Sequence, residues 1–182
     1  DFTASRKYHG FNDHRGGGHF SGRLTLPLVA AGVVAKKIIP HVQFHSRLIE
    51  AGGDKDTVKA VEDAKISGDS IGGIVECTAV GLPVGYGEPF FDSIESVIAH
   101  LVFSIPAIKG VEFGSGFSSA RMRGSEHNDS FVSSEGATRT NNSGGVSGGI
   151  SNGNELVVRV AVKPTSSTPA EQSSLNMSSG EM

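Results

Sequence analysis

The chain has 182 residues, with 16 Lys and Arg, 19 Asp and Glu, a net charge of −3 and a pI near 6.2. This length allows a buried core, and without basic blocks neither nucleic acid nor a membrane surface is expected as a partner. No apolar run approaches the roughly 18 residues that span a bilayer, and the first six residues lack a signal-peptide pattern. Together with a single cysteine, these features favour small-molecule chemistry in a reducing cytoplasm.

The loop Arg15–Arg23 is the first informative segment, since three glycines, His19, Ser21 and Arg23 precede an apolar helix. Glycine lets a backbone approach a ligand, and the N-terminus of a helix attracts anions. The guanidinium of Arg23 suits a carboxylate or phosphate. The loop predicts an anion site, while a polar loop that only caps the helix remains the alternative.

The segment Leu24–Ile39 is apolar around nearly the whole helical circumference, which predicts a buried helix. Lys36 and Lys37 suit its last turn, and Pro40 ends it. Gln43–Ile49 reads as a short strand.

The segment Asp54–Ile66 is predicted to be an amphipathic helix with Asp54 as its N-cap. Ile71–Val80 is β-branched and flanked by glycines, so we expect a strand with Cys77 buried in it. Asp92–Phe103 has apolar residues spaced by three and four, which predicts a second strong helix.

Three strands are predicted after residue 104, at Ile108–Phe113, Phe117–Met122 and Leu156–Val162. Long stretches without helices between them favour an α+β fold with antiparallel sheets over a doubly wound parallel fold. The next segment, Lys163–Ser167, combines one cation with three hydroxyls and is a second candidate anion site.

Common catalytic motifs for P-loop, dinucleotide-binding and zinc-protease sites are absent from the sequence. His9, His14 and His19 are spaced by five, which matches neither a helical pair nor one face of a strand. We therefore expect no metal site there.

The residues do resemble a known family. Gly16–Thr25 followed by Val29–Lys37 is similar to the central signature of chorismate synthase, which usually reads GGGRSSARET and then VAAGAIAKK. Further matches follow in the family's order: Gly68–Gly73, Gly81–Asp92, Ser104–Glu112, Gly124–Asp129, Gly144–Gly153 and Lys163–Ser167. His19 replaces the usual arginine and Gly22 the usual alanine, which weakens any side-chain role for position 19.

The resemblance implies an enzyme that converts 5-enolpyruvylshikimate 3-phosphate to chorismate by anti-1,4 elimination of phosphate, with reduced FMN as cofactor. It also implies a sandwich of helices between antiparallel β-sheets, usually assembled as a homotetramer. The chain, residues 1–182, would form a single domain that is an incomplete core of this fold. Whether such an enzyme reduces its flavin itself with NADPH or relies on a separate reductase is left open.

Residue by residue, the resemblance assigns flavin binding, a catalytic role for Ser21 as a hydrogen bonder to the flavin, and substrate binding by Arg23. The expected flavin contacts are His19, Phe20, Ser21, Pro106, Ala107, Gly148, Lys163, Pro164, Thr165, Ser166 and Ser167. Ser21 could instead be only a helix cap, and Arg23 only part of a surface ion pair.

By the same resemblance, two catalytic histidines and the Gly-Arg-His-Asp segment of the family fall outside these residues. We therefore expect the 182-residue chain alone to be inactive. The alternatives are a non-catalytic oligomerisation core and an anion- or flavin-binding module. If the glycine clusters 16–23 and 144–149 and the segment 163–167 lined one pocket, the scaffold alternative would lose support.

Overall fold

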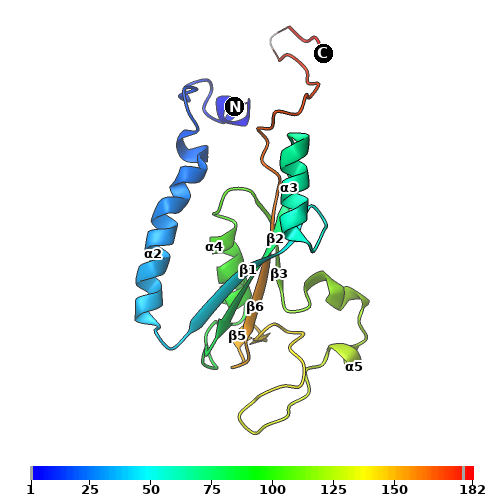
Figure 1. Cartoon of the computed structure of the whole chain (residues 1–182). Helices are drawn as coiled ribbons and strands as arrows, with labels where there is room; N and C mark the ends of the chain where they lie inside the picture. The colour runs from blue at the N-terminus through cyan, green and yellow to red at the C-terminus, as the bar shows by residue number, and fades with distance from the viewer. Residues whose placement is uncertain (1, 178) are drawn as a thin grey trace.

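A four-stranded antiparallel sheet organises the molecule (Figure 1). The computed structural model describes residues 2–177 and 179–182. In spatial order, the strands are β1 (Gln43–Ala51), β2 (Gly73–Val80), β6 (Leu156–Val162) and β3 (Ile108–Phe113). Each neighbouring pair is antiparallel, and β6, the last of these four strands in sequence, lies between β2 and β3. The predicted α+β class with antiparallel strands is confirmed.

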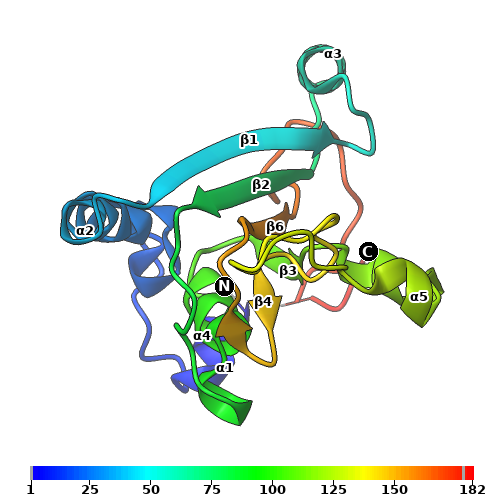
Figure 2. The ribbon, with the colours of Figure 1, turned by 90° about the horizontal axis from the view of Figure 1, so that it is seen from below.

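The longer helices are α2 (Thr25–Ile38), α3 (Thr57–Ser67) and α4 (Ile94–Val102). Figure 2 shows α4 on one face of the sheet, whereas α2 stands at the side near the start of β1. Ile94 and Ile98 of α4 contact a buried core formed by Val42, Ala79, Val146, Leu156 and Val158. Burial of these apolar side chains fixes α4 against the sheet.

Short elements complete the described chain. They are α1 (Phe2–Lys7), α5 (Gly124–His127), the two-stranded ribbon of β4 (Val146–Ser147) and β5 (Ile150–Ser151), and the 3-10 turns η1 (Gly18–Phe20), η2 (Gly22–Leu24), η3 (Phe90–Asp92) and η4 (Gly116–Arg121). The ribbon lies at the end of the sheet where β6 begins, because Val157 N donates to Gly144 O.

The N-cap of α3 is Asp56, and the prediction of Asp54 was wrong. The carboxylate of Asp56 accepts a hydrogen bond from Lys59 N at 3.1 Å. Asp54 instead shapes the preceding turn, since its backbone pairs with Ala51 and its Oδ1 accepts from Asp56 N at 2.9 Å.

The predicted strand Phe117–Met122 was also wrong, because this segment lies in the 3-10 helix η4. Gly114 and Gly116 adopt positive φ values of 54° and 52°, which turn the chain away from the edge of the sheet after β3. Ser118 N then donates to Ser115 O and Met122 N to Ser119 O, so i to i+3 turns replace strand pairing.

The helix predicted over Leu24–Ile39 is present as α2, but the expectation that it is buried was wrong. Leu26 is 76% exposed and Ile38 is 75% exposed. The helix stands apart from α4 in both views, so no layer of the described chain covers its apolar side chains (Figures 1 and 2). Within the described residues, no helix combines the length and apolarity that a membrane span requires.

Cys77 lies in β2 as expected, but its side chain is exposed rather than buried. Its neighbour on the edge strand β1 is the small, exposed Ser46, which leaves the thiol open on that side. Partial burial still raises the pKa of the Cys77 thiol, and the charge of Lys36 acts in the opposite direction.

Candidate functional site

The loop before α2 consists of two consecutive 3-10 turns, η1 and η2, joined at Ser21. Ser21 Oγ accepts a hydrogen bond from Arg23 N at 3.3 Å, so Ser21 does cap η2. This cap uses the hydroxyl only as an acceptor. The Ser21 O–H therefore remains a potential donor to a ligand.

Only one of the two guanidiniums of this loop is available to an anion. Arg15 Nε and Nη2 both donate to the carboxylate of Asp13, each at 2.9 Å. Arg23 is exposed and forms no ion pair with the residues that the structure describes. Its five donors are free for a planar carboxylate or a phosphate.

A cavity with three aromatic rings lies beside η1. Its lining residues are Ala4, Tyr8, Phe11, Asn12, Asp13, His14, Gly16, Gly17, Gly18, His19 and Phe20. The glycines expose backbone groups in this wall, while the rings of Tyr8, Phe11 and Phe20 provide apolar surface. His19 and Phe20, both predicted flavin contacts, thus belong to one cavity.

Two predicted flavin-binding segments that are far apart in sequence meet at the end of β6. Lys163 N donates to Ala107 O at 2.9 Å. Ala107 has a φ of 73°, an uncommon conformation for a residue with a side chain, and Pro106 beside it is exposed. Lys163 to Ser167 are all exposed, and within the described chain the Lys163 ammonium bonds only to the neighbouring Pro164 O, at 3.3 Å.

Gly148 lies away from these residues, in the two-residue turn between β4 and β5. Gly148 and Gly149 have φ values of 61° and 84°, as a type I′ hairpin turn requires. The turn is at the end of the sheet where β6 begins, whereas Lys163 follows the other end of that strand (Figure 1). The seven residues of β6 separate the two by roughly 20 Å.

In the part of the chain that the structure describes, the three clusters at 16–23, 144–149 and 163–167 therefore do not line one pocket. The cavity beside η1 is walled by residues 4 to 20 alone. No predicted site residue among the described ones is buried. In the part of the chain described, no group of three or more His, Cys, Asp or Glu is placed to hold a metal.

Asp129 organises the loop that leads from α5 to the β4–β5 ribbon. Its carboxylate accepts from Thr140 Oγ1 and Asn142 N, each at 2.8 Å, and from Ser143 N at 2.9 Å. Partial burial raises the pKa of Asp129, but the hydrogen bonds from the two amides and the hydroxyl outweigh it and hold the pKa below its usual value. Asp129, the last residue of the block Gly124–Asp129, thus holds the chain that leads directly into the block Gly144–Gly153.

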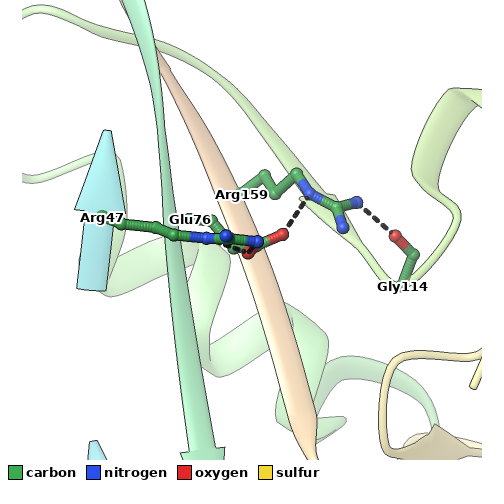
Figure 3. A network of polar contacts seen from close by, with 4 residues as sticks. All are labelled: Arg47, Glu76, Gly114 and Arg159. Carbon is green, nitrogen blue, oxygen red and sulfur yellow. Dashed lines mark hydrogen bonds and ion pairs between the residues drawn. The ribbon is translucent and has the colours of Figure 1, made fainter. Parts of the chain in front are cut away.

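A charged network across the sheet was not predicted from the sequence (Figure 3). Glu76 is only 7% exposed, and its two oxygens accept from Arg47 Nη2 at 2.7 Å and from Arg159 Nε at 2.8 Å. Arg159 Nη1 also donates to Gly114 O at 2.6 Å. The hydrogen bonds from Arg47 and then Arg159 hold the pKa of Glu76 below its usual value, against the effect of burial.

The charges of this network alternate along the sheet once the strands are aligned. Arg47, Glu76, Arg159 and Glu112 are opposite one another in the registers of the four strands, so alternating charges cross the sheet in one row. The pairing of strands must be known before this row can be seen.

Comparisons with known proteins place these features in a family. The family model described as chorismate synthase matches residues 1–182. The chorismate synthase of Chitinophaga pinensis is 63% identical over the whole chain, and that of Korarchaeum cryptofilum is 44% identical over 97% of it. A crystal structure of a chorismate synthase superposes with a TM-score of 0.81 at 31% identity, covering 90% of this chain and 62% of that one.

The chain spans about half the length of the curated relatives it matches, 55% in the first case and 58% in the second. The match nevertheless extends over all 182 residues and agrees in both sequence and fold. The chain belongs to the chorismate synthase family.

Proposed function

We propose that the protein to which this chain belongs converts 5-enolpyruvylshikimate 3-phosphate to chorismate and phosphate, by an anti-1,4 elimination that requires reduced FMN. The contact between Lys163 N and Ala107 O at 2.9 Å carries the proposal, because it joins two segments that the resemblance assigns separately to the flavin. Family membership supports it across the whole chain.

The residues present fit FMN, which combines a phosphate with a planar aromatic ring. Lys163 offers an exposed ammonium, and three hydroxyls follow within four residues. These groups would hold the phosphate. Pro106, Ala107 and the segment His19–Ser21 would contact the ring, since η1 supplies backbone groups and the ring of Phe20. When bound and reduced, FMN supplies an electron-rich ring for the elimination.

Arg23 is the residue proposed to bind the substrate, which carries a phosphate and carboxylates. Its guanidinium has no counterion among the described residues, and Ser21 fixes its backbone through the hydrogen bond at 3.3 Å. A cation near the leaving phosphate stabilises the negative charge that develops as the C–O bond breaks. Ser21 remains the proposed catalytic hydrogen bonder.

Closure of the site is proposed to require more than this chain. Most of the predicted contacts are exposed, Ser21 and Ala107 are partly buried, and Gly148 lies at the opposite end of β6 from Lys163. Exclusion of water strengthens the electrostatic interactions on which the elimination depends. We therefore propose that the remaining length of the protein and assembly into a homotetramer, in the cytoplasm, complete the site.

The alternative of a non-catalytic oligomerisation core is favoured by one observation, the separation of the glycine clusters at 16–23 and 144–149. A non-catalytic core does not explain why Ala107 adopts a positive φ beside Lys163. Strained backbone of this kind concentrates at functional sites.

The proposal is tested by titrating FMN and riboflavin, reduced and anaerobic and with the substrate present, into the protein extended to the full length of its relatives. Riboflavin lacks the phosphate, so Lys163→Ala is expected to weaken FMN binding about tenfold and to leave riboflavin unchanged. Lys55→Ala, at another exposed lysine, is the matched control. Equal affinity of the wild type for the two flavins, or no loss in Lys163→Ala, would contradict the assignment of the phosphate site.

A further inference from the structure

The segment Lys163–Ser167, which follows β6, is held by contacts with another part of the chain, although all five residues are exposed. The block Gly68–Gly73 lies along it, between the end of α3 and the start of β2. Figure 1 shows the chain leaving β6 past this end of α3. The resemblance gives no role to Gly68–Gly73.

Two hydrogen bonds join Gly68–Gly73 to Lys163–Ser167 and to the residue that follows it. Ser70 Oγ donates to Thr165 O at 2.7 Å, across 95 residues of sequence. Thr168 Oγ1 donates to Gly68 O at 3.3 Å, just beyond the hydroxyl cluster. Both bonds act on the backbone or the flank of the segment, so the side chains of Thr165, Ser166 and Ser167 keep their hydroxyls for a ligand.

Gly72 makes room for the same segment. A Cβ on Gly72 would lie 2.7 Å from Val162 O and 3.2 Å from Pro164 Cδ, both closer than ordinary contact. Any side chain there would push Pro164 away from the sheet. Gly72 O in turn accepts from Gly52 N at 2.8 Å, which ties the block to the turn after β1.

We propose that Gly68–Gly73 is a cradle that fixes the backbone of Lys163–Ser167, with Ser70 as its positioning residue and Gly72 as the point of close approach. This inference rests on the proposed function only for the identity of the ligand. Ser70 touches neither flavin nor substrate and acts through the carbonyl of Thr165. Fixing this carbonyl in advance removes an ordering cost that phosphate binding would otherwise carry.

The first test needs no ligand. Backbone ¹⁵N order parameters are measured for the wild-type chain and for Ser70→Ala, Ser70→Thr and Ser67→Ala. Among the described residues, the Ser67 hydroxyl bonds only to Ala64 O, at 2.9 Å inside α3, which makes Ser67→Ala a matched control. The order parameters of Thr165–Ser167 are expected to fall from about 0.85 to below about 0.6 in Ser70→Ala and to stay near 0.85 in the other three chains.

The second test is the ratio of FMN to riboflavin affinity in the wild type and the same three variants, each extended to the full length of its relatives. Ser70→Ala is expected to lower FMN affinity about threefold to tenfold without changing riboflavin affinity, and Ser70→Thr to restore it. A purely structural role of Ser70 would weaken both flavins equally. That result, or unchanged order parameters in Ser70→Ala, would overturn the cradle.

The two proposals fail in different ways. If the wild type does not prefer FMN to riboflavin, the phosphate assignment falls, and the order parameters alone decide whether the cradle exists. If the wild type prefers FMN and Ser70→Ala behaves as the wild type in both tests, the cradle falls and the proposed function stands.

Discussion

Glu76 shows how differently two carboxylates of this chain contribute to its stability. Glu76 is almost fully buried and bound by two arginines, while Asp63 forms an exposed pair with Lys59 at 2.6 Å. Charge-assisted hydrogen bonds in a partly dry site are worth far more than an exposed helix pair. Arg159, with a side chain 28% exposed, is the less hydrated partner, whereas Arg47, at 74%, donates two hydrogen bonds to Glu76.

Glu76→Gln is expected to lower the free energy of unfolding by about 2 kcal/mol at pH 7, measured by urea denaturation. The pKa of Glu76 is lowered in the folded state, so its contribution is complete above the ordinary carboxyl pKa of about 4.3. It is lost as the pH falls through the lower, folded value. The difference between wild type and variant should therefore shrink below about pH 4.

Asp63→Asn is the matched control, with an expected change below about 0.5 kcal/mol at pH 7. A Glu76→Gln chain as stable as the wild type at pH 7, or a difference that grows in acid, would show that the network does not stabilise the fold.

At the scale of elements, α2 and β6 have similar apolar sequences and opposite surroundings. Val158 of β6 is 8% exposed, whereas Val29 of α2 is 68% exposed. The apolar surface removed from water, rather than hydrophobicity itself, sets the stabilisation.

Val158→Ala is expected to cost about 2 kcal/mol, because it leaves a cavity in the core. Val29→Ala should change the stability of the 182-residue chain by less than about 0.5 kcal/mol. Thermal and urea denaturation of the two variants measure this. A large loss from Val29→Ala would mean that α2 packs against the rest of the chain in solution.

Periodicity and composition predicted most of these elements, because they are local properties. The helix at 24–39 and the strands at 108–113 and 156–162 match the structure closely. The exposure of α2 and Cys77 could not be predicted, since apolar sequence indicates a preference for burial but not whether a covering layer is present. The 3-10 helix that begins at Gly116 could not be predicted, because it follows from positive φ values at Gly114 and Gly116, which the periodicity of apolar residues does not indicate.

The candidate site was only partly predictable for a related reason. Sequence identified Lys163–Ser167 and Pro106–Ala107 separately, and only the antiparallel register of β3 and β6 brings them together. Ser70 escaped notice because its partner lies 95 residues away and accepts through a backbone carbonyl. Every residue has a main-chain carbonyl, so the amino-acid sequence does not indicate which one accepts the bond from Ser70.

At the scale of the whole molecule, the isolated 182-residue chain is expected to show no turnover with substrate and reduced FMN. The exposed contacts and the distance of Gly148 from Lys163 leave the proposed site open to water. Phosphate release under anaerobic, reducing conditions is the measurement, and a protein extended to the full length of its relatives is the positive control. Sustained phosphate release by the short chain would refute this expectation.

The position of β6 also determines the order in which the molecule can be built. Because β6, the last of these four strands to be synthesised, lies between β2 and β3, the described sheet cannot close until residues near 162 have left the ribosome. Until then β3 has no partner among the four described strands, and β2 presents an open edge to other nascent chains. Pairing across such long sequence separations is slow. Folding yield in a cell should therefore depend on the delay between synthesis of β3 and pairing of β6 with its two neighbours.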